Sequence, residues 1–359
     1  MNKKLVALAV SAIAAGAASA QTANVTLYGI VDTYLASERT SGVGAVAAKT
    51  TTLVTGGGLS GSRFGLRGSE SLGGGMNAFF TLESGFNSDN GSLGQGGLMF
   101  GRRAIVGVNG GFGSIQMGRD YSPNFYVMCN SDDTFGGCLT GFSAVANMGG
   151  FFANTLRQNN QVRYSTPNMG GLTADLAVSL GEVAGSSSGA RTIGANIQYK
   201  NGPIYAGLGF SDSKNGVGPF SGDFAGLPAT TAPGSVSSKQ FIFGATYNFG
   251  VAYAGVTYIE NKKWDGTKTK PLIGSVTVPF GAARIGLQLA QSKSGSNKAQ
   301  SFALLGEYDL SKRTEVYGGY SQCKNKGITC AADGNTAAST ATINGQTGSA
   351  IAIGLKHKF

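Results

Sequence analysis

Arginines alternate with apolar residues in the stretch Arg63-Phe64-Gly65-Leu66-Arg67. Successive side chains of an extended strand point to opposite faces, so Arg63 and Arg67 would share one face and Phe64 and Leu66 the other. Guanidinium groups stay charged at any physiological pH and attract anions. The chemistry that this spacing indicates is therefore anion attraction along one face of a strand.

Other charged side chains follow the same alternation further along the chain. Glu83 has the opposite parity to Leu82, and Arg157 and Arg163 share a parity opposite to Val162. An arginine that points into hydrocarbon costs about 2–4 kcal/mol at the middle of a bilayer. If these strands cross a membrane, we expect their charged faces to line a water-filled interior.

Some charged positions remain open between two interpretations. The residues alone do not decide whether Arg102 or Arg103 points inward, because apolar residues follow on both faces. Arg119 and Asp120 could pair with each other or could touch an ion path. For every arginine of the set, Arg67 and Arg163 above all, the plainer alternative is a solvated salt bridge with a nearby carboxylate.

The N-terminus is typical of a secretory signal. Lys3 and Lys4 precede a short apolar run and the small-residue site Ala18-Ser19-Ala20, which predicts a cleaved signal over residues 1–20. The apolar run is too short for a membrane-spanning helix. We expect residues 21–359 to form a single domain.

The composition favours a membrane β-barrel. Charged residues make up only 13% of the chain, about half of the ~25% usual for soluble domains, and there are 59 glycines. No run after the signal approaches the ~18 apolar residues of a transmembrane helix. The net charge of +10 is basic, but an exported protein rarely meets nucleic acid, so we expect no nucleic-acid partner.

Runs with a period of two recur along the chain, for example over residues 25–31, 76–83, 173–178 and 351–359. Seven short turns rich in Gly, Asn and Pro alternate with eight longer polar connections, one of which is expected near residues 294–298. Fifteen connections join sixteen strands. Such short alternating segments are typical of transmembrane barrels; a soluble β-sandwich shows the same alternation, so the number of repeats matters. The prediction is an all-β fold, a 16-stranded antiparallel transmembrane β-barrel, wide enough for an aqueous channel.

The four cysteines, Cys129, Cys138, Cys323 and Cys330, fit an oxidising compartment. They allow three pairings, of which the two local ones, Cys129–Cys138 and Cys323–Cys330, are expected. Zinc is the rival interpretation, but the spacing fits no usual zinc pattern and the one histidine, His357, is remote. We therefore expect no metal site.

Several stretches together resemble one family, the trimeric general porins of Gram-negative outer membranes, in particular the anion-selective β-proteobacterial branch. The likeness runs in order over almost the whole mature chain. The stretches are "VTLYGIVD", "SRFGLRGSESLGGGMNAFFTLESGF", "GRRAIVGVNGGFGSIQMGRDYSP", "VRYSTPNMGGL", "YNFGVA", "EYDLSKRTEVYGGY" and the terminal "IAIGLKHKF".

The resemblance implies an outer-membrane diffusion channel for small hydrophilic solutes and ions that prefers anions. It implies that the third extracellular loop, from after Pro123 to about Thr155, folds into the barrel, where a Cys129–Cys138 disulfide would help to hold the aperture. The residues that match the family's pore constriction are Arg63, Arg102, Arg157 and the wall acid Glu83, and the match favours Arg102 over Arg103; Arg67, Arg163, Arg119 and Asp120 are secondary candidates.

The resemblance also implies partners. These are lipid and lipopolysaccharide of the outer membrane, small anions and hydrophilic solutes, two further copies in a homotrimer, and the barrel assembly machinery, for which the terminal Phe359 is a signal. No cofactor is expected, because the "GGG" stretches have neither the Lys-Ser/Thr nor the helix of a phosphate-binding loop.

Three other functions remain as alternatives. A barrel hydrolase needs a histidine base near its nucleophile, and His357 shares its parity with Leu355 and Phe359, so it points outward and an enzyme is disfavoured. A substrate-specific channel on the same barrel would want aromatic residues along the lumen, for which Tyr28 and Tyr34 have the right parity. An adhesin would rely on long loops that here are plain runs of Gly, Ser, Ala and Thr.

Overall fold

The computed structural model describes residues 24–45, 49–54, 57–131, 156–217, 224, 226–333 and 338–359. The predicted signal peptide lies outside the described residues. The strands are β1 (Asn24–Ser41), β2 (Lys49–Val54), β3 (Arg63–Gly73), β4 (Met76–Gly85), β5 (Arg103–Gly110), β6 (Gly113–Tyr121), β7 (Arg157–Ser165), β8 (Leu172–Ser179), β9 (Thr192–Asn201), β10 (Ile204–Lys214), β11 (Ser237–Asn248), β12 (Tyr253–Lys262), β13 (Lys268–Thr269), β14 (Leu272–Phe280), β15 (Ala283–Ser294), β16 (Asn297–Asp309), β17 (Thr314–Lys326), β18 (Cys330–Ala331), β19 (Thr340–Ala341) and β20 (Thr347–Lys358).

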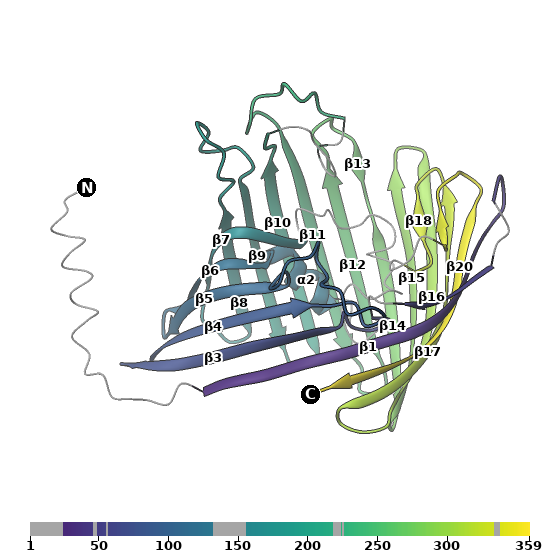
Figure 1. Ribbon diagram of the computed structural model, residues 1–359, viewed down its shortest axis with the longest axis horizontal. Helices are drawn as coiled ribbons and strands as arrows, with labels where there is room; N and C mark the ends of the chain where they lie inside the picture. The colour runs from purple at the N-terminus through teal and green to yellow at the C-terminus, as the bar shows by residue number, and fades with distance from the viewer. Residues whose placement is uncertain are drawn as a thin grey trace.

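Sixteen of these strands form a closed antiparallel barrel (Figure 1). Each of β1, β3 to β12, β14 to β17 and β20 pairs with the next, and β20 pairs back to β1 from Ile30–Lys358 to Ser41–Thr347. Short strands β2, β13, β18 and β19 belong to the connections. The predicted 16-stranded all-β barrel is confirmed.

The two faces of the sheet have the polarity expected of a membrane barrel. In β20 the alternating residues Ile351, Ile353 and Leu355 are 58%, 66% and 47% exposed on the outer surface. Residues of the other parity, Ala350, Ala352 and Lys356, are buried inside. In β3, Phe64 and Leu66 are likewise exposed, and Gly65 between them is buried. The apolar face of each strand therefore looks outward, the reverse of a soluble sheet.

Short turns join the strands at one end of the barrel and longer connections join them at the other. The turn from β3 to β4 uses Gly73, Gly74 and Gly75, all with φ between 59° and 79°, a region that glycine enters without steric cost. One connection predicted to be long, between β15 and β16, is a tight turn of only Gly295 and Ser296.

One helix, α2 (Pro123–Ser131), follows β6 and lies inside the barrel beside β9 and β11 (Figure 1). Its Asn124 donates to Gln240 Oε1 at 3.0 Å, and its Ser131 hydroxyl lies 2.7 Å from that of Thr257. Gly244 makes room for it, because a Cβ there would lie 2.3 Å from Cβ of Ser131. No helix in the described ranges is long and apolar enough to span a membrane.

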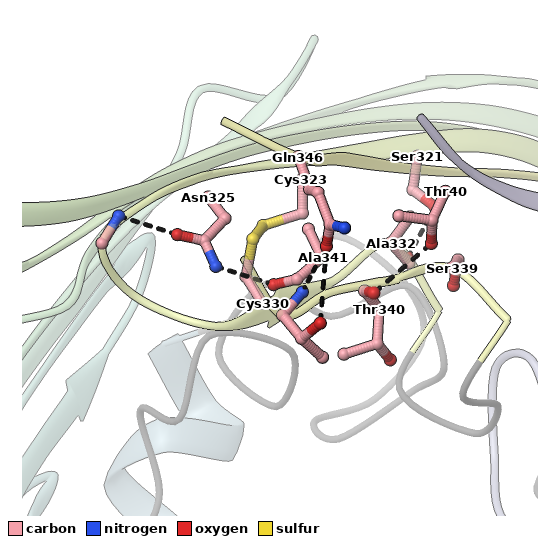
Figure 2. Close-up of a disulfide and its surroundings, with 12 residues drawn as sticks. Thr40, Ser321, Cys323, Asn325, Cys330, Ala332, Ser339, Thr340, Ala341 and Gln346 are labelled. Carbon is pink, nitrogen blue, oxygen red and sulfur yellow. Dashed lines mark hydrogen bonds between the residues drawn. A yellow bond between two sulfur atoms is a disulfide. The ribbon is translucent and has the colours of Figure 1, made fainter. Parts of the chain in front are cut away.

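The connection between β17 and β20 also packs against the inner wall (Figure 2). Cys323 and Cys330 form a disulfide, and Asn325 donates to the Ala341 carbonyl at 2.9 Å. The Ser339 hydroxyl donates to Glu38 of β1 at 2.8 Å. This second inward connection was not predicted, although the two cysteines at its start were the signal for a compact loop.

Candidate functional site

Charged side chains gather on the inner wall formed by β3 to β7. Their strands bring together residues that are far apart in sequence. All lie at the loop end of their strands except Arg102, which directly precedes β5, and Arg163, which lies further along β7. The set consists of Arg63, Glu83, Arg102, Arg103, Arg119, Asp120, Arg157 and Arg163. These are all the predicted site residues except Arg67, the cysteines and Phe359.

A first network is centred on Tyr121. Arg102 donates from Nε to Glu83 Oε1 at 2.7 Å and from Nη2 to the Tyr121 hydroxyl at 2.8 Å. Arg157 donates to the same hydroxyl at 2.6 Å, and its guanidinium carbon lies 4.3 Å from the centre of the Tyr121 ring. Tyr28 donates to the other oxygen of Glu83 at 3.0 Å. One tyrosine thus holds two arginines, of which only Arg102 has a carboxylate partner among the residues that the structure describes.

A second network is centred on Asp120, which is 1% exposed. Arg103 donates to both of its oxygens, at 2.8 and 3.1 Å, and Arg163 lies 3.2 Å from one of them. Gln116 donates to Asp120 Oδ2 at 2.6 Å. A buried carboxylate with two guanidinium partners is internally compensated, so this network braces β5, β6 and β7.

The contacts in the two networks answer two questions that the sequence left open: which of Arg102 and Arg103 points inward, and whether Arg119 pairs with Asp120. Arg102 and Arg103 both contact inner-wall carboxylates: Arg103 is the first residue of β5, while Arg102 precedes the strand and so escapes its alternation. Arg119 does not pair with Asp120. It donates to the Gly101 carbonyl at 2.8 Å and to Asn159 Oδ1 at 2.5 Å.

Three arginines of the set lack a carboxylate partner. Within the described residues, no carboxylate oxygen lies within 4.0 Å of Arg63, Arg119 or Arg157. Arg63 donates from Nε to the Gly61 carbonyl at 2.8 Å. At longer range, electrostatic interactions connect Arg63 with Arg102, Glu83 and Arg157, Arg157 with Arg102 and Glu83, and Arg119 with Arg157. The unpaired charges are therefore neighbours of one another.

The alternation predicted for residues 157–163 is broken by a β-bulge. Gly118 pairs with Gln161 and Asp120 with Gln158, so β7 has one residue more than β6 at this point. Asn160, with φ of 52°, absorbs the irregularity. Bulges of this kind redirect side chains, so the position of Arg157 follows from the bulge rather than from strict parity with Arg163.

Tyr126 of α2 adds a neutral group beside the Asp120 network. Its ring lies 4.8 Å from the guanidinium carbon of Arg163, and its hydroxyl lies 3.4 Å from Asp120 Oδ2. Burial raises the pKa of Tyr126 above its ordinary value, and the negative charge of Asp120 acts in the same direction. The phenol therefore stays protonated and remains a donor toward Asp120.

The remaining predicted residues lie elsewhere. Arg67 is exposed toward the turn end of β3, with its guanidinium carbon 5.3 Å from the centre of the Tyr28 ring. Cys129 in α2 is disulfide-bonded, whereas Cys138 lies outside the described residues. Phe359 is 46% exposed at the end of the chain, where its backbone pairs with Gly29 of β1.

The residues that sequence reasoning missed are Tyr121, Gln116 and Tyr126, which orient the charged groups. No spacing signal singles them out because, apart from the bond from Gln116 to Asp120 within β6, their charged partners belong to other segments of the chain. Among the residues that the structure describes, no cluster of three or more His, Cys, Asp or Glu side chains could hold a metal ion.

Comparison with known proteins places the chain in one family. The model of a family described as Gram-negative porin matches residues 7–328. The chain is 35% identical, over 382 aligned residues and the whole of both chains, to outer membrane porin protein 32 of Delftia acidovorans. It is 29% identical over the whole of both chains to an outer membrane porin protein of Bordetella pertussis.

A solved structure agrees with these relatives. The anion-selective porin from Comamonas acidovorans matches with a TM-score of 0.77 and 30% sequence identity, covering 94% of this chain and 100% of that one. The family resemblance seen in the sequence motifs is thereby confirmed. The chain belongs to the Gram-negative porin family, and it is an outer-membrane porin, a passive channel rather than an enzyme.

Proposed function

We propose that this porin passes small hydrophilic solutes and ions and prefers anions, through a constriction lined by Arg63, Arg102 and Arg157 with Glu83 opposing them. The observation that carries the proposal is the lack of a carboxylate within 4.0 Å of Arg63 and Arg157 among the described side chains. An uncompensated guanidinium in a narrow aqueous passage raises the local concentration of anions.

The two arginines of the Tyr121 network have different roles. Glu83 neutralises Arg102, so Arg102 contributes position and hydrogen bonds more than net charge. Arg157 keeps its charge while the Tyr121 ring and hydroxyl hold it in place. Several fixed, partly hydrated cations in sequence bind an anion weakly enough for it to leave again, which conduction requires.

The position of α2 supports an inward third loop as the element that narrows the pore. The helix contacts the inner faces of β9 to β12. Tyr121, the last residue of β6, stacks on its Phe125 at a centroid distance of 3.9 Å. We propose that the rest of the loop continues this narrowing. Its residues 132–155, with Cys138, lie outside the described residues.

The wider assembly is part of the same proposal. Residues 1–20 would be a cleaved signal, and the barrel assembly machinery would recognise the C-terminal strand that ends at Phe359. Three copies would associate within lipid and lipopolysaccharide.

The similarity to an anion-selective porin supports the ion preference. The alternative is a substrate-specific channel on the same barrel, which would show saturation by one solute class.

The test is the reversal potential of purified protein in a planar bilayer under a potassium chloride gradient. The wild type should show anion preference. Arg63→Ala and Arg157→Ala should each lower the anion-to-cation permeability ratio by about two- to threefold, since the interaction of two unit charges at roughly 6–10 Å in water is worth about 0.4–0.7 kcal/mol. Arg313→Ala, an exposed turn residue, is the matched control. Cation preference in the wild type would refute the proposal.

A further inference from the structure

An apolar hollow lies on the outer wall of the barrel, over the neighbouring strands β15, β16, β17 and β20 (Figure 1). Its volume is about 620 Å³, within the range of small-molecule sites. Its floor is the pair Gly306 and Gly318, which lie opposite each other on β16 and β17. Ile285 and Ile353 continue the same row on either side, and both point outward. Two adjacent missing side chains therefore open a gap in an otherwise filled apolar surface.

Large side chains enclose this gap along the strands. Leu304 pairs with Tyr320 on its loop side, and Tyr308 pairs with Val316 on its turn side. The described lining residues are aliphatic, aromatic or glycine, and phenol hydroxyls are the only polar groups on their side chains. A wall of this kind suits a hydrocarbon chain rather than an ion or a sugar, because a polar ligand would lose its water without gaining hydrogen bonds.

The fold does not require a glycine at position 306. Its φ is not positive, and a Cβ there would have one atom within 4 Å, the carbonyl oxygen of Gly318 at 3.9 Å. The inward-facing Gly354 differs, because a Cβ there would lie 2.2 Å from the Tyr317 ring. A glycine inside a strand weakens it and often marks a place where a ligand comes close to the backbone. An occupant of the hollow accounts for Gly306, whereas packing within the chain does not.

Exposed cations lie at the turn end of the same strands. Lys312 and Arg313 are exposed in the turn between β16 and β17, and no carboxylate oxygen of the described residues lies within 4.0 Å of either. The short turns of outer-membrane barrels face the periplasm, so these charges lie at the periplasmic surface of the membrane. Thr314 at the start of β17 lies roughly 14 Å along the strand from Gly318. A lipid with its headgroup at the turn can therefore extend an acyl chain into the hollow.

We propose that the hollow, together with Lys312 and Arg313, is a binding site for an anionic diacyl phospholipid of the periplasmic leaflet. One acyl chain fills the space over Gly306 and Gly318 and makes the van der Waals contacts that the two glycines leave unmade. The phosphate interacts with the two cations, since lysine and arginine near a membrane surface attract anionic lipids. The site lies on the outer wall, so it shares no residue with the proposed anion pathway.

The test is native mass spectrometry of the purified protein in detergent, titrated with phosphatidylglycerol or with phosphatidylethanolamine, which has no net charge. The wild type should bind one phosphatidylglycerol per chain in a saturable way and phosphatidylethanolamine about tenfold more weakly. Gly306→Leu fills the hollow and should weaken the binding of both lipids about tenfold. Gly274→Leu is the matched control and should bind as the wild type does, because Gly274 is also exposed on the outer wall and a Cβ there would meet no atom within 4 Å.

The headgroup contact is tested separately. Lys312→Gln with Arg313→Gln should abolish the preference for phosphatidylglycerol, whereas Lys262→Gln with Lys298→Gln, which removes two exposed charges at the loop end, should keep it.

Circular dichroism identifies any variant that fails to fold. Equal binding of phosphatidylglycerol by the wild type and Gly306→Leu, or an equal loss in Gly274→Leu, overturns the site. Equal affinity of the wild type for the two lipids overturns the headgroup assignment. A lower trimer fraction of Gly306→Leu in native electrophoresis, with lipid binding unchanged, would assign the hollow to a second copy of the chain and would also overturn the proposal.

Discussion

Two groups of arginines lie on the same part of the inner wall and differ in their partners. Arg102, Arg103 and Arg163 contact Glu83 or Asp120 and are largely or partly buried. Arg63, Arg119 and Arg157 instead contact backbone carbonyls, an amide or a phenol. Their sequence contexts are alike, so residue type alone does not separate the groups.

The difference shows how one residue type serves two purposes. A buried guanidinium with a carboxylate partner adds little net field, because the two charges cancel, but removal of either partner leaves a costly buried charge. A guanidinium held by neutral groups keeps its field and can act on passing ions. The paired group is therefore expected to control stability and the unpaired group to control selectivity.

The largest effect, a loss of stability, is expected from Asp120→Ala in the paired group. It removes the shared partner of Arg103 and Arg163. Arg103 then has no ion-pair partner among the described residues and Arg163 keeps only Asp175 at 4.0 Å, so the barrel should be destabilised by about 3–5 kcal/mol. Denaturant unfolding of the purified protein, followed by tryptophan fluorescence or circular dichroism, measures this. Asp89→Ala in an exposed loop is the control; an equal effect of the two variants would contradict a bracing role for Asp120.

Tyr121→Phe tests the link between the groups. The hydroxyl accepts from Arg102 and Arg157, so its removal should cost about 1–3 kcal/mol of stability and should also increase current noise by loosening Arg157. Tyr308→Phe, with an exposed outward ring, should change neither. If Tyr121→Phe leaves both stability and noise as in the wild type, the tyrosine does not position these arginines.

Glu83→Gln should move Arg102 from the paired to the unpaired group. The amide oxygen can still accept from Arg102, and the amide NH2 can donate to the Tyr28 hydroxyl oxygen. The negative charge is lost, so anion preference should rise by about two- to threefold. The sign is opposite to that of Arg63→Ala, and reversal potentials measure both. Glu260→Gln, a loop-end carboxylate beside Lys268, is the matched control; a fall in anion preference in Glu83→Gln would refute this division of roles.

The smallest effect is expected from Arg67→Ala. Its guanidinium lies over the Tyr28 ring and is exposed, a contact worth about 0.5–1 kcal/mol at most. The reversal potential should stay within error of the wild type, unlike that of Arg63→Ala four residues away. A shift as large as that of Arg63→Ala would place Arg67 in the unpaired selectivity group.

Much of the barrel could be predicted because its signals are local. Period-two alternation places Phe64 and Leu66 outside and Gly65 inside without knowledge of any contact, and turn chemistry separates the strands. The exception, the two-residue turn at Gly295 and Ser296, was predicted to be longer because polar residues at strand ends resemble loop residues. The inward connection between β17 and β20 depends on contacts with β1, which no local pattern contains.

By itself, the sequence determined the export signal pattern, the alternation and the supply of arginines on inward-facing positions. Only the tertiary structure decided which arginines are neutralised. Glu83 reaches Arg102 rather than Arg63, and Asp120 reaches Arg103 and Arg163 rather than its neighbour Arg119. The physical reason is that ion pairing depends on cross-strand register, and a single bulge in β7 resets that register beside the site.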